Sequence, residues 1–305
     1  MENAFEKAAV AVTIILLAQL LKWAGVFKAD DYKVAAKICI NITLPAAIIT
    51  VFAGFRREPS LYMVVLLGIL CNVVVLASVW YATRKEPAEE RLVPLLNIPG
   101  YQIGTFSLPL IGSLLGPYSV LVTCMFDLGN AVMCAGLSYA LVSASVIPGR
   151  DRGFSWRSIT SKLLSSAPFD VYVLLLLWTS VGFRLPEWLL AAAKPAAGAN
   201  FFLAMFMIGL MIDIRLNHRQ LRALLRLIAA HFGTSLVFAL FFWFCTPFSL
   251  EIRRTLAIII FSPISALSPV FTSRCGGDTA LSSLACSVSI LVSIVCMMAV
   301  CAVTA

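Results

Sequence analysis

Long apolar runs separated by short clusters of charged and turn-forming residues dominate the pattern along the 305-residue chain. Ten runs are visible, at about residues 8–27, 34–53, 61–82, 92–114, 118–144, 168–185, 196–214, 220–246, 254–273 and 279–304. A helix needs about 20 residues to cross the hydrocarbon core of a membrane. The runs are too long and continuous for barrel strands, and backbone groups in lipid must be bonded internally. The pattern therefore predicts an all-α fold with ten transmembrane helices.

Composition agrees with this prediction. Hydrophobic residues make up 61% of the chain and charged residues 12%, whereas a soluble domain has about 45–50% and about 25%. The nine cysteines form no CxxC pair and most lie in apolar runs, so neither a metal site nor a disulfide framework is expected. The chain has a net charge of +8, but its Lys and Arg residues are scattered between apolar runs. Their placement therefore indicates how the protein is oriented in a membrane and does not indicate binding to nucleic acid.

The basic residues are divided unevenly between the two ends of the predicted spans. Of the 23 Lys and Arg, the smaller set shares a side with both termini and consists of Lys7, Arg56, Arg57, Arg184, Lys194, Arg253 and Arg254. The others lie at the opposite ends. Because cytoplasmic loops carry the excess of basic residues, we expect both termini to lie outside the cytosol.

The longest hydrophilic stretch, residues 145–166, divides the chain into residues 1–145 and 146–305, with five predicted spans each. An odd number of spans makes the second half enter the membrane in the opposite sense, which is the inverted repeat of many secondary transporters. The stretch from Pro109 to Gly116 in the fourth span also resembles that from Pro269 to Gly276 in the ninth.

Two spans in corresponding positions carry helix-breaking residues, at residues 97–109 and 262–269. Proline inside a helix costs about 3 kcal/mol, and unwound backbone at membrane depth is tolerated where it is buried in protein or lines a cavity. Such pairs mark the substrate site of many transporters, although a proline can also simply kink a helix. The candidate substrate-binding residues are Gln102, Thr105, Ser107, Pro109, Pro263, Ser265 and Ser268. Asn41 in the second span is a further candidate, although the favoured interpretation of the sequence from Asn41 to Pro45 is a proline kink.

Two polar residues in the fifth span are candidates for ion coupling. Asp127 lies about ten residues into the span, and Asn130, three residues on, shares its helix face. A charge at the bilayer centre costs about 2.5–3.5 kcal/mol and needs a reason. Asp127 is interpreted either as a functional group, which carries a proton or cation such as sodium or lines the substrate path, or as a structural carboxyl hydrogen-bonded within the bundle. His231, alone in the eighth span, is expected to be a packing residue.

The sequence has no GxxxxGK, HExxH or GxSxG motif, so neither ATP-driven pumping nor hydrolysis has residues to support it. We therefore expect no enzyme, cofactor or metal.

Five short stretches resemble motifs of the auxin efflux carrier family, which includes bacterial organic-acid carriers and plant PIN auxin exporters. They are Asn41-Ile-Thr-Leu-Pro45, Pro109 with Gly116, Phe126-Asp127-Leu128-Gly129-Asn130, Ile208-Gly209-Leu210, and Pro263 with Gly276-Gly277-Asp278. The chain departs from the family at Gln102 and Leu267, where Asn is frequent, and at Ser107, where Gly is frequent. The resemblance implies two inverted halves, a scaffold of spans 1, 2, 6 and 7, a moving core of spans 3–5 and 8–10, and a carboxylate substrate where the fourth and ninth spans cross.

These observations favour a secondary transporter of a small organic anion that works by alternating access. A sodium- or proton-coupled symporter of the bile acid carrier type is one alternative, and a membrane sensor that does not transport is another. The expected partners are a small organic anion and the lipid bilayer, with a proton or sodium ion and a second copy in a homodimer as further candidates.

Overall fold

The computed structural model describes residues 2–28, 30–55, 57–146, 164, 166–213 and 220–304. Within them the secondary structure is helical, apart from one isolated antiparallel bridge between Tyr101 and Ile264. Five helical stretches are long and apolar enough to cross a membrane: Tyr32–Phe52, Pro59–Thr83, Glu187–Met211, Leu221–Cys245 and Thr279–Val303. The expected all-α class with apolar, membrane-type helices is thereby confirmed.

The predicted boundary after residue 145 falls at the end of a helix, and most of the hydrophilic stretch that follows lies outside the described residues. Several residues of the charge count also lie outside them, namely Arg56, Arg150, Arg152, Arg157, Lys162, Arg215 and Arg219.

One group of helices is built around α11. It consists of α1 (Glu2–Trp23), α2 (Tyr32–Ile38), the π-helix η1 (Cys39–Thr43), α3 (Leu44–Phe52), α10 (Ala167–Val181) and α11 (Glu187–Met211). Helix α11 packs most extensively against α1, α3 and α2. A Cβ atom at Gly209 would lie 2.6 Å from the Cβ of Ala18, so glycine there permits the close approach of α1 and α11.

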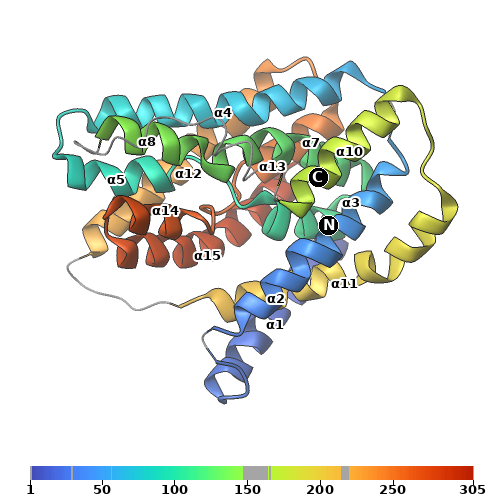
Figure 1. Cartoon of the computed structure of the whole chain (residues 1–305), viewed down its shortest axis with the longest axis horizontal. Helices are drawn as coiled ribbons and strands as arrows, with labels where there is room; N and C mark the ends of the chain where they lie inside the picture. The colour runs from blue at the N-terminus through green and yellow to red at the C-terminus, as the bar shows by residue number, and fades with distance from the viewer. Residues whose placement is uncertain are drawn as a thin grey trace.

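The remaining helices form a second group. It contains α4 (Pro59–Thr83), α5 (Ala88–Asn97), η2 (Ile103–Ser107), α6 (Leu108–Leu114), α7 (Pro117–Val132), η3 (Met133–Leu137), α8 (Ser138–Val146), α12 (Leu221–Cys245), α13 (Leu250–Ile259), α14 (Ser268–Cys275) and α15 (Thr279–Val303). Figure 1 shows α5, α8 and α14 towards one end of the long axis and α3 and α10 towards the other, with α4 running along most of its length.

Helices α4 and α7 pack closely along their length because glycines face each other across the contact. A Cβ atom at Gly129 would lie 3.0 Å from the backbone nitrogen of Ile69, and a Cβ atom at Gly68 would collide with the carbonyl oxygen of Phe126. Helices α4 and α7 therefore form a tightly packed pair within the second group.

Each of the two stretches with helix-breaking residues contains a non-helical break. The first break separates α5, which ends at Asn97, from η2, which begins at Ile103, and Gly100 within it has a φ of +92°. The second break separates α13, which ends at Ile259, from α14, which begins at Ser268. Pro109 and Pro269 lie in the first turns of α6 and α14, where a missing N–H costs no helical hydrogen bond.

Candidate functional site

The two breaks meet inside the second group. The backbone N–H of Gln102 donates to the carbonyl oxygen of Pro263 over 2.9 Å, next to the bridge between Tyr101 and Ile264. Further along, the hydroxyl oxygens of Ser107 and Ser262 lie 2.5 Å apart. The breaks therefore contact each other through both backbone and side chains.

Two buried asparagines satisfy backbone groups of the first break. Asn130 donates from Nδ2 to the carbonyl oxygen of Tyr101 (2.8 Å) and accepts from the Tyr101 N–H at Oδ1 (3.1 Å). Asn72 of α4 accepts from the Gly100 N–H (2.7 Å) and donates to Asn130 Oδ1 (3.2 Å). Because unpaired backbone groups are costly in a water-free interior, these amides stabilise the extended segment.

The second break is bonded chiefly to α15. The N–H of Ile264 donates to the hydroxyl of Ser289 over 3.1 Å, and the thiol of Cys286 donates to the carbonyl oxygen of Ser265 over 3.4 Å. The Ser262 hydroxyl bonds back to the carbonyl oxygen of Ile259. Small polar side chains thus replace the helical hydrogen bonds that the break removes.

His231 of α12 lies between the two breaks and is fully buried. Its Nδ1 is 3.0 Å from the carbonyl oxygen of Ile98, and its Nε2 is 3.0 Å from the carbonyl oxygen of Ser262. The ring also packs on Tyr101, with 5.4 Å between ring centroids. Both ring nitrogens have partners, but each partner belongs to a different break.

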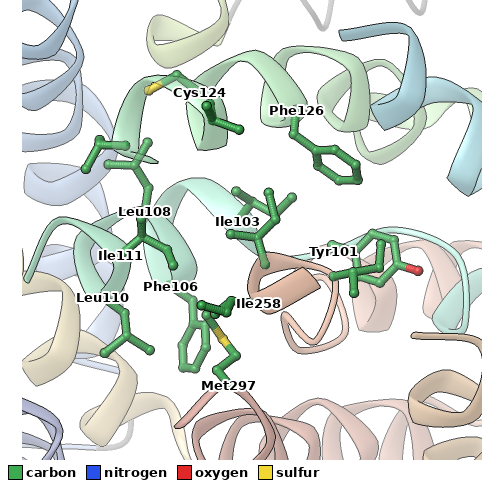
Figure 2. Packing of buried hydrophobic residues seen from close by; sticks show 14 of the residues in the cluster. Tyr101, Ile103, Phe106, Leu108, Leu110, Ile111, Cys124, Phe126, Ile258 and Met297 are labelled. Carbon is green, nitrogen blue, oxygen red and sulfur yellow. The ribbon is translucent and has the colours of Figure 1, made fainter. Parts of the chain in front are cut away.

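Apolar packing holds the segment after the first break from both sides. Figure 2 shows Ile103, Phe106 and Ile111 between the side chains of α7 above, among them Phe126, and Ile258 and Met297 below. Phe106, Ile111 and Phe126 are each fully buried. The position of the polar groups at the break is therefore fixed by a continuous core.

A cavity of about 490 Å³ opens between the two groups of helices, beside the crossing of the breaks. Five of the candidate residues line it: Gln102, Thr105, Ser265, Asp127 and Asn130. Its wall also includes Ile40 and Leu44 of the α11 group and Phe169 of α10. The structure thus brings together candidates from the fourth, fifth and ninth predicted spans on one surface.

The other candidates do not line this cavity. Ser107 and Ser268 are buried, and Ser107 Oγ lies 3.8 Å from the sulfur of Met297. Pro263 contributes its carbonyl oxygen to the crossing, whereas Pro109 lies in the first turn of α6. Asn41 is exposed and donates to the carbonyl oxygen of Lys37 on its own helix (2.8 Å), away from the others.

Asp127 is 8% exposed and has a hydrogen-bond donor on each carboxylate oxygen. Oδ1 accepts from Nδ2 of Asn130 and Oδ2 accepts from the hydroxyl of Tyr172, both over 3.1 Å. Tyr172 comes from α10, so this carboxylate joins the two groups of helices. Gly104 leaves room for it, because a Cβ atom there would lie 2.9 Å from Asp127 Oδ2.

Gln102 offers a polar atom to the cavity. Its Nε2 donates to the hydroxyl of Thr105 over 3.2 Å, while its Oε1 is buried with no hydrogen-bond partner among the described residues. A buried amide group that lacks a partner is costly. Because Oε1 only accepts, a ligand could pair with it through a donor group such as a hydroxyl, but not through a carboxylate oxygen.

Two residues of the site were not expected from the sequence to take part. Arg274, in the last turn of α14, was expected only to be one of the basic residues at the cytoplasmic ends of the spans, but it lines the same cavity. Of the lining residues in the described part of the chain, Arg274 is the positively charged one and Asp127 the negatively charged one. No local feature of the sequence marked Tyr172 as a residue of the site.

Among the described residues, no cluster of three His, Cys, Asp or Glu side chains is placed to hold a metal ion.

A scan against protein-family models gives no match for the chain, and a search of curated proteins also gives none.

Proposed function

We propose that the protein is a secondary transporter of a small organic anion and that the substrate binds in the 490 Å³ cavity beside the two breaks. The observation that carries the proposal is the contact between the breaks, in which Gln102 N donates to the Pro263 carbonyl (2.9 Å), next to a cavity lined by Gln102. Paired interrupted helices at membrane depth are typical of transporter substrate sites. A cavity of this size is suited to a small molecule.

The order of the helices supports ten passes in two inverted halves, residues 1–145 and 146–305. In this proposal α5–α6, α7–α8 and α13–α14 are interrupted passes, α2–α3 is one pass that continues through the π-helix η1, and α1, α4, α10, α11, α12 and α15 are single helices. The α11 group acts as the scaffold and the second group as the moving core. This arrangement, with both termini outside the cytosol, is the one that the resemblance to auxin efflux carriers implies.

The lining of the cavity suits an anion with an apolar body. Arg274 supplies a positive charge, and Gln102 and Ser265 supply neutral polar groups that can hold a carboxylate and release it again. Phe169, Phe271 and Leu267 give the cavity apolar walls. Binding between the scaffold and the core would allow alternating access, because movement of one against the other exposes the cavity to either side.

Coupling to a cation is a second candidate function, and the position of Asp127 favours it. Its carboxylate lines the same cavity, where its negative charge would repel an anionic substrate. A proton or sodium ion bound with the substrate would remove that repulsion. This second candidate corresponds to a symporter of the bile acid carrier type.

Uptake by purified protein in proteoliposomes tests the proposal. We would screen radiolabelled mono- and dicarboxylates, and compare the wild type with Arg274→Gln and with Lys194→Gln, which changes an exposed residue outside the cavity lining. We expect Arg274→Gln to reduce uptake at least tenfold, equivalent to about 1.4 kcal/mol, and Lys194→Gln to retain it. If no acid gave either flux or thermal stabilisation, the result would contradict the proposal and favour a membrane sensor.

A further inference from the structure

The carbonyl groups that face His231 are products of the two breaks. In an uninterrupted helix, the carbonyl of Ile98 would accept from the N–H of Gln102. That N–H donates instead to Pro263, so the Ile98 carbonyl needs another donor. His231 Nδ1 lies 3.0 Å from it, and Nε2 lies 3.0 Å from the Ser262 carbonyl of the second break.

The two contacts cannot both be hydrogen bonds of a neutral ring. A carbonyl oxygen only accepts, and a neutral imidazole has one N–H and one nitrogen lone pair. With both nitrogens 3.0 Å from a carbonyl oxygen, a neutral ring would place a lone pair against one of the two oxygens. Only the doubly protonated ring donates to both.

We propose that His231 is a positioning residue that holds the two breaks together as an imidazolium, donating one hydrogen bond to each. The link to transport depends on the proposed function; the protonation of the ring in the crossed state does not. Charge-assisted hydrogen bonds are about twice as strong as neutral ones, which offsets part of the cost of a buried charge.

The titratable side chains nearest to the ring are a phenol and two thiols, and the nearest carboxylate is connected to it indirectly. The faces of α4 and α15 carry no Asp, Glu, Lys or Arg. Tyr101 packs on the ring at a tilt of 46°, Cys134 Sγ lies 3.8 Å from the Tyr101 carbonyl oxygen, and Cys286 bonds to the Ser265 carbonyl. Phenol and thiol groups of ordinary acidity are neutral at pH 7. Asp127 reaches the same segment through Asn130, which bonds both to its carboxylate and to the backbone of Tyr101.

Loss of the ring proton would therefore weaken the crossing. One carbonyl would face a lone pair, and the two breaks would be held by the remaining contacts between Gln102 and Pro263 and between the serines. Because the crossed state holds the proton, its stability is greatest at low pH and falls as the pH rises through the titration of the ring. Release of the proton from His231 would therefore be coupled to separation of the two breaks.

The protonation state can be measured directly. The chain has two histidines, His218 and His231, so His218→Ala leaves a single imidazole to observe. We would record 15N spectra of histidine-labelled His218→Ala protein in lipid nanodiscs between about pH 5 and pH 8. We expect both ring nitrogens to be protonated at the acidic end and one to lose its proton on titration. A singly protonated ring over the whole range would overturn the inference.

Variants give a second readout that does not require transport. His231→Phe keeps a ring without donors, and His231→Gln can donate to one carbonyl. We expect melting temperatures lower by about 2–4 °C for each kcal/mol of stability lost, with the Gln variant between wild type and Phe. The decisive result is pH dependence: wild type and His218→Ala lose stability as the pH rises, and His231→Phe does not. Identical pH profiles for wild type and His231→Phe would refute the role of His231 even if uptake assays support transport.

Discussion

The hydroxyl of Tyr172 donates to the carboxylate of Asp127 over 3.1 Å, and this bond joins α10 of the α11 group to α7 of the second group. Both side chains are buried and both line the cavity. Under the proposed function, a substrate in the cavity would meet a polar link between the two groups of helices. We expect the strength of this link to affect how easily the two groups separate.

Tyr172→Phe should weaken this link without opening a large cavity. We expect a loss of about 1–3 kcal/mol in the free energy of unfolding, because one carboxylate oxygen loses its donor, and a change in the rate of uptake. Tyr62→Phe is the matched control, since its hydroxyl bonds to Ser180 at an exposed site (2.7 Å). Thermal melts and initial uptake rates check both variants, and equal effects in the two would argue against a special role for Tyr172.

Asn130→Ala should be among the most damaging amide substitutions. It removes two hydrogen bonds to Tyr101 and one to Asp127 in a buried site, where each unsatisfied group costs about 1–3 kcal/mol. Asn41→Ala removes one exposed bond to its own helix, with an expected effect within about 0.5 kcal/mol. Melting temperatures in detergent measure the difference. Similar losses would show that the asparagine network does not hold the first break.

Pro263→Ala should impair uptake while expression and folding remain intact. Alanine supplies an N–H and loosens the restriction on Ser262, so the chain can extend α13 into the second break. Pro109→Ala should have a smaller effect, because Pro109 lies in the first turn of α6, where no helical hydrogen bond is gained. Pro195→Ala is a suitable control because Pro195 lies inside α11 and outside the cavity lining. Uptake in proteoliposomes at matched protein content gives the comparison. Unchanged uptake by Pro263→Ala would reject the role given to the breaks.

Gly104→Ala should displace the carboxylate of Asp127. The added methyl would lie 2.9 Å from Asp127 Oδ2 and 3.3 Å from a methyl carbon of Leu44, tighter than ordinary packing. Gly198→Ala meets nothing within 4 Å and lies inside α11, where alanine favours the helix by up to about 1 kcal/mol. We therefore expect opposite signs of the change in melting temperature. Stabilisation of both variants would mean that Asp127 has room to move.

Asp127→Asn tests cation coupling. If the carboxylate carries a proton or sodium ion with the substrate, the neutral amide should abolish the dependence of uptake on that ion while substrate binding persists. The dependence on each ion is measured as the change in uptake by wild type and Asp127→Asn when sodium and pH gradients are imposed. Wild-type uptake that is indifferent to both gradients would exclude the coupled mechanism and leave Asp127 as a structural group.

The interrupted helices could be predicted from the sequence because the cause is local. Pro99 and Gly100 in one span and Pro263 in the other disfavour helix whatever surrounds them. The polar side chains that follow, Gln102 and Ser265, were placed at the cavity for the same reason: they sit within a few residues of the break. Asp127 and Asn130 stood out because polar groups are rare in apolar runs.

The partners of the breaks could not be predicted, since they come from distant parts of the chain. Asn72 bonds to Gly100 from a helix that ends well before it, and His231 contacts carbonyls 133 residues away and 31 residues away. Arg274 was assigned to a span edge because hydropathy alone does not show that a cavity reaches there. These roles depend on how helices pack, and no local pattern records that packing.

The glycines that face each other between α4 and α7 have a consequence for any change of shape. Where two backbones touch directly, there are no long side chains between them to slide or change rotamer, so Gly68 and Gly129 hold their helices in a fixed register. We therefore expect α4 and α7 to remain together in any change of shape. An opening between the two groups of helices would have to occur at contacts such as that between Tyr172 and Asp127.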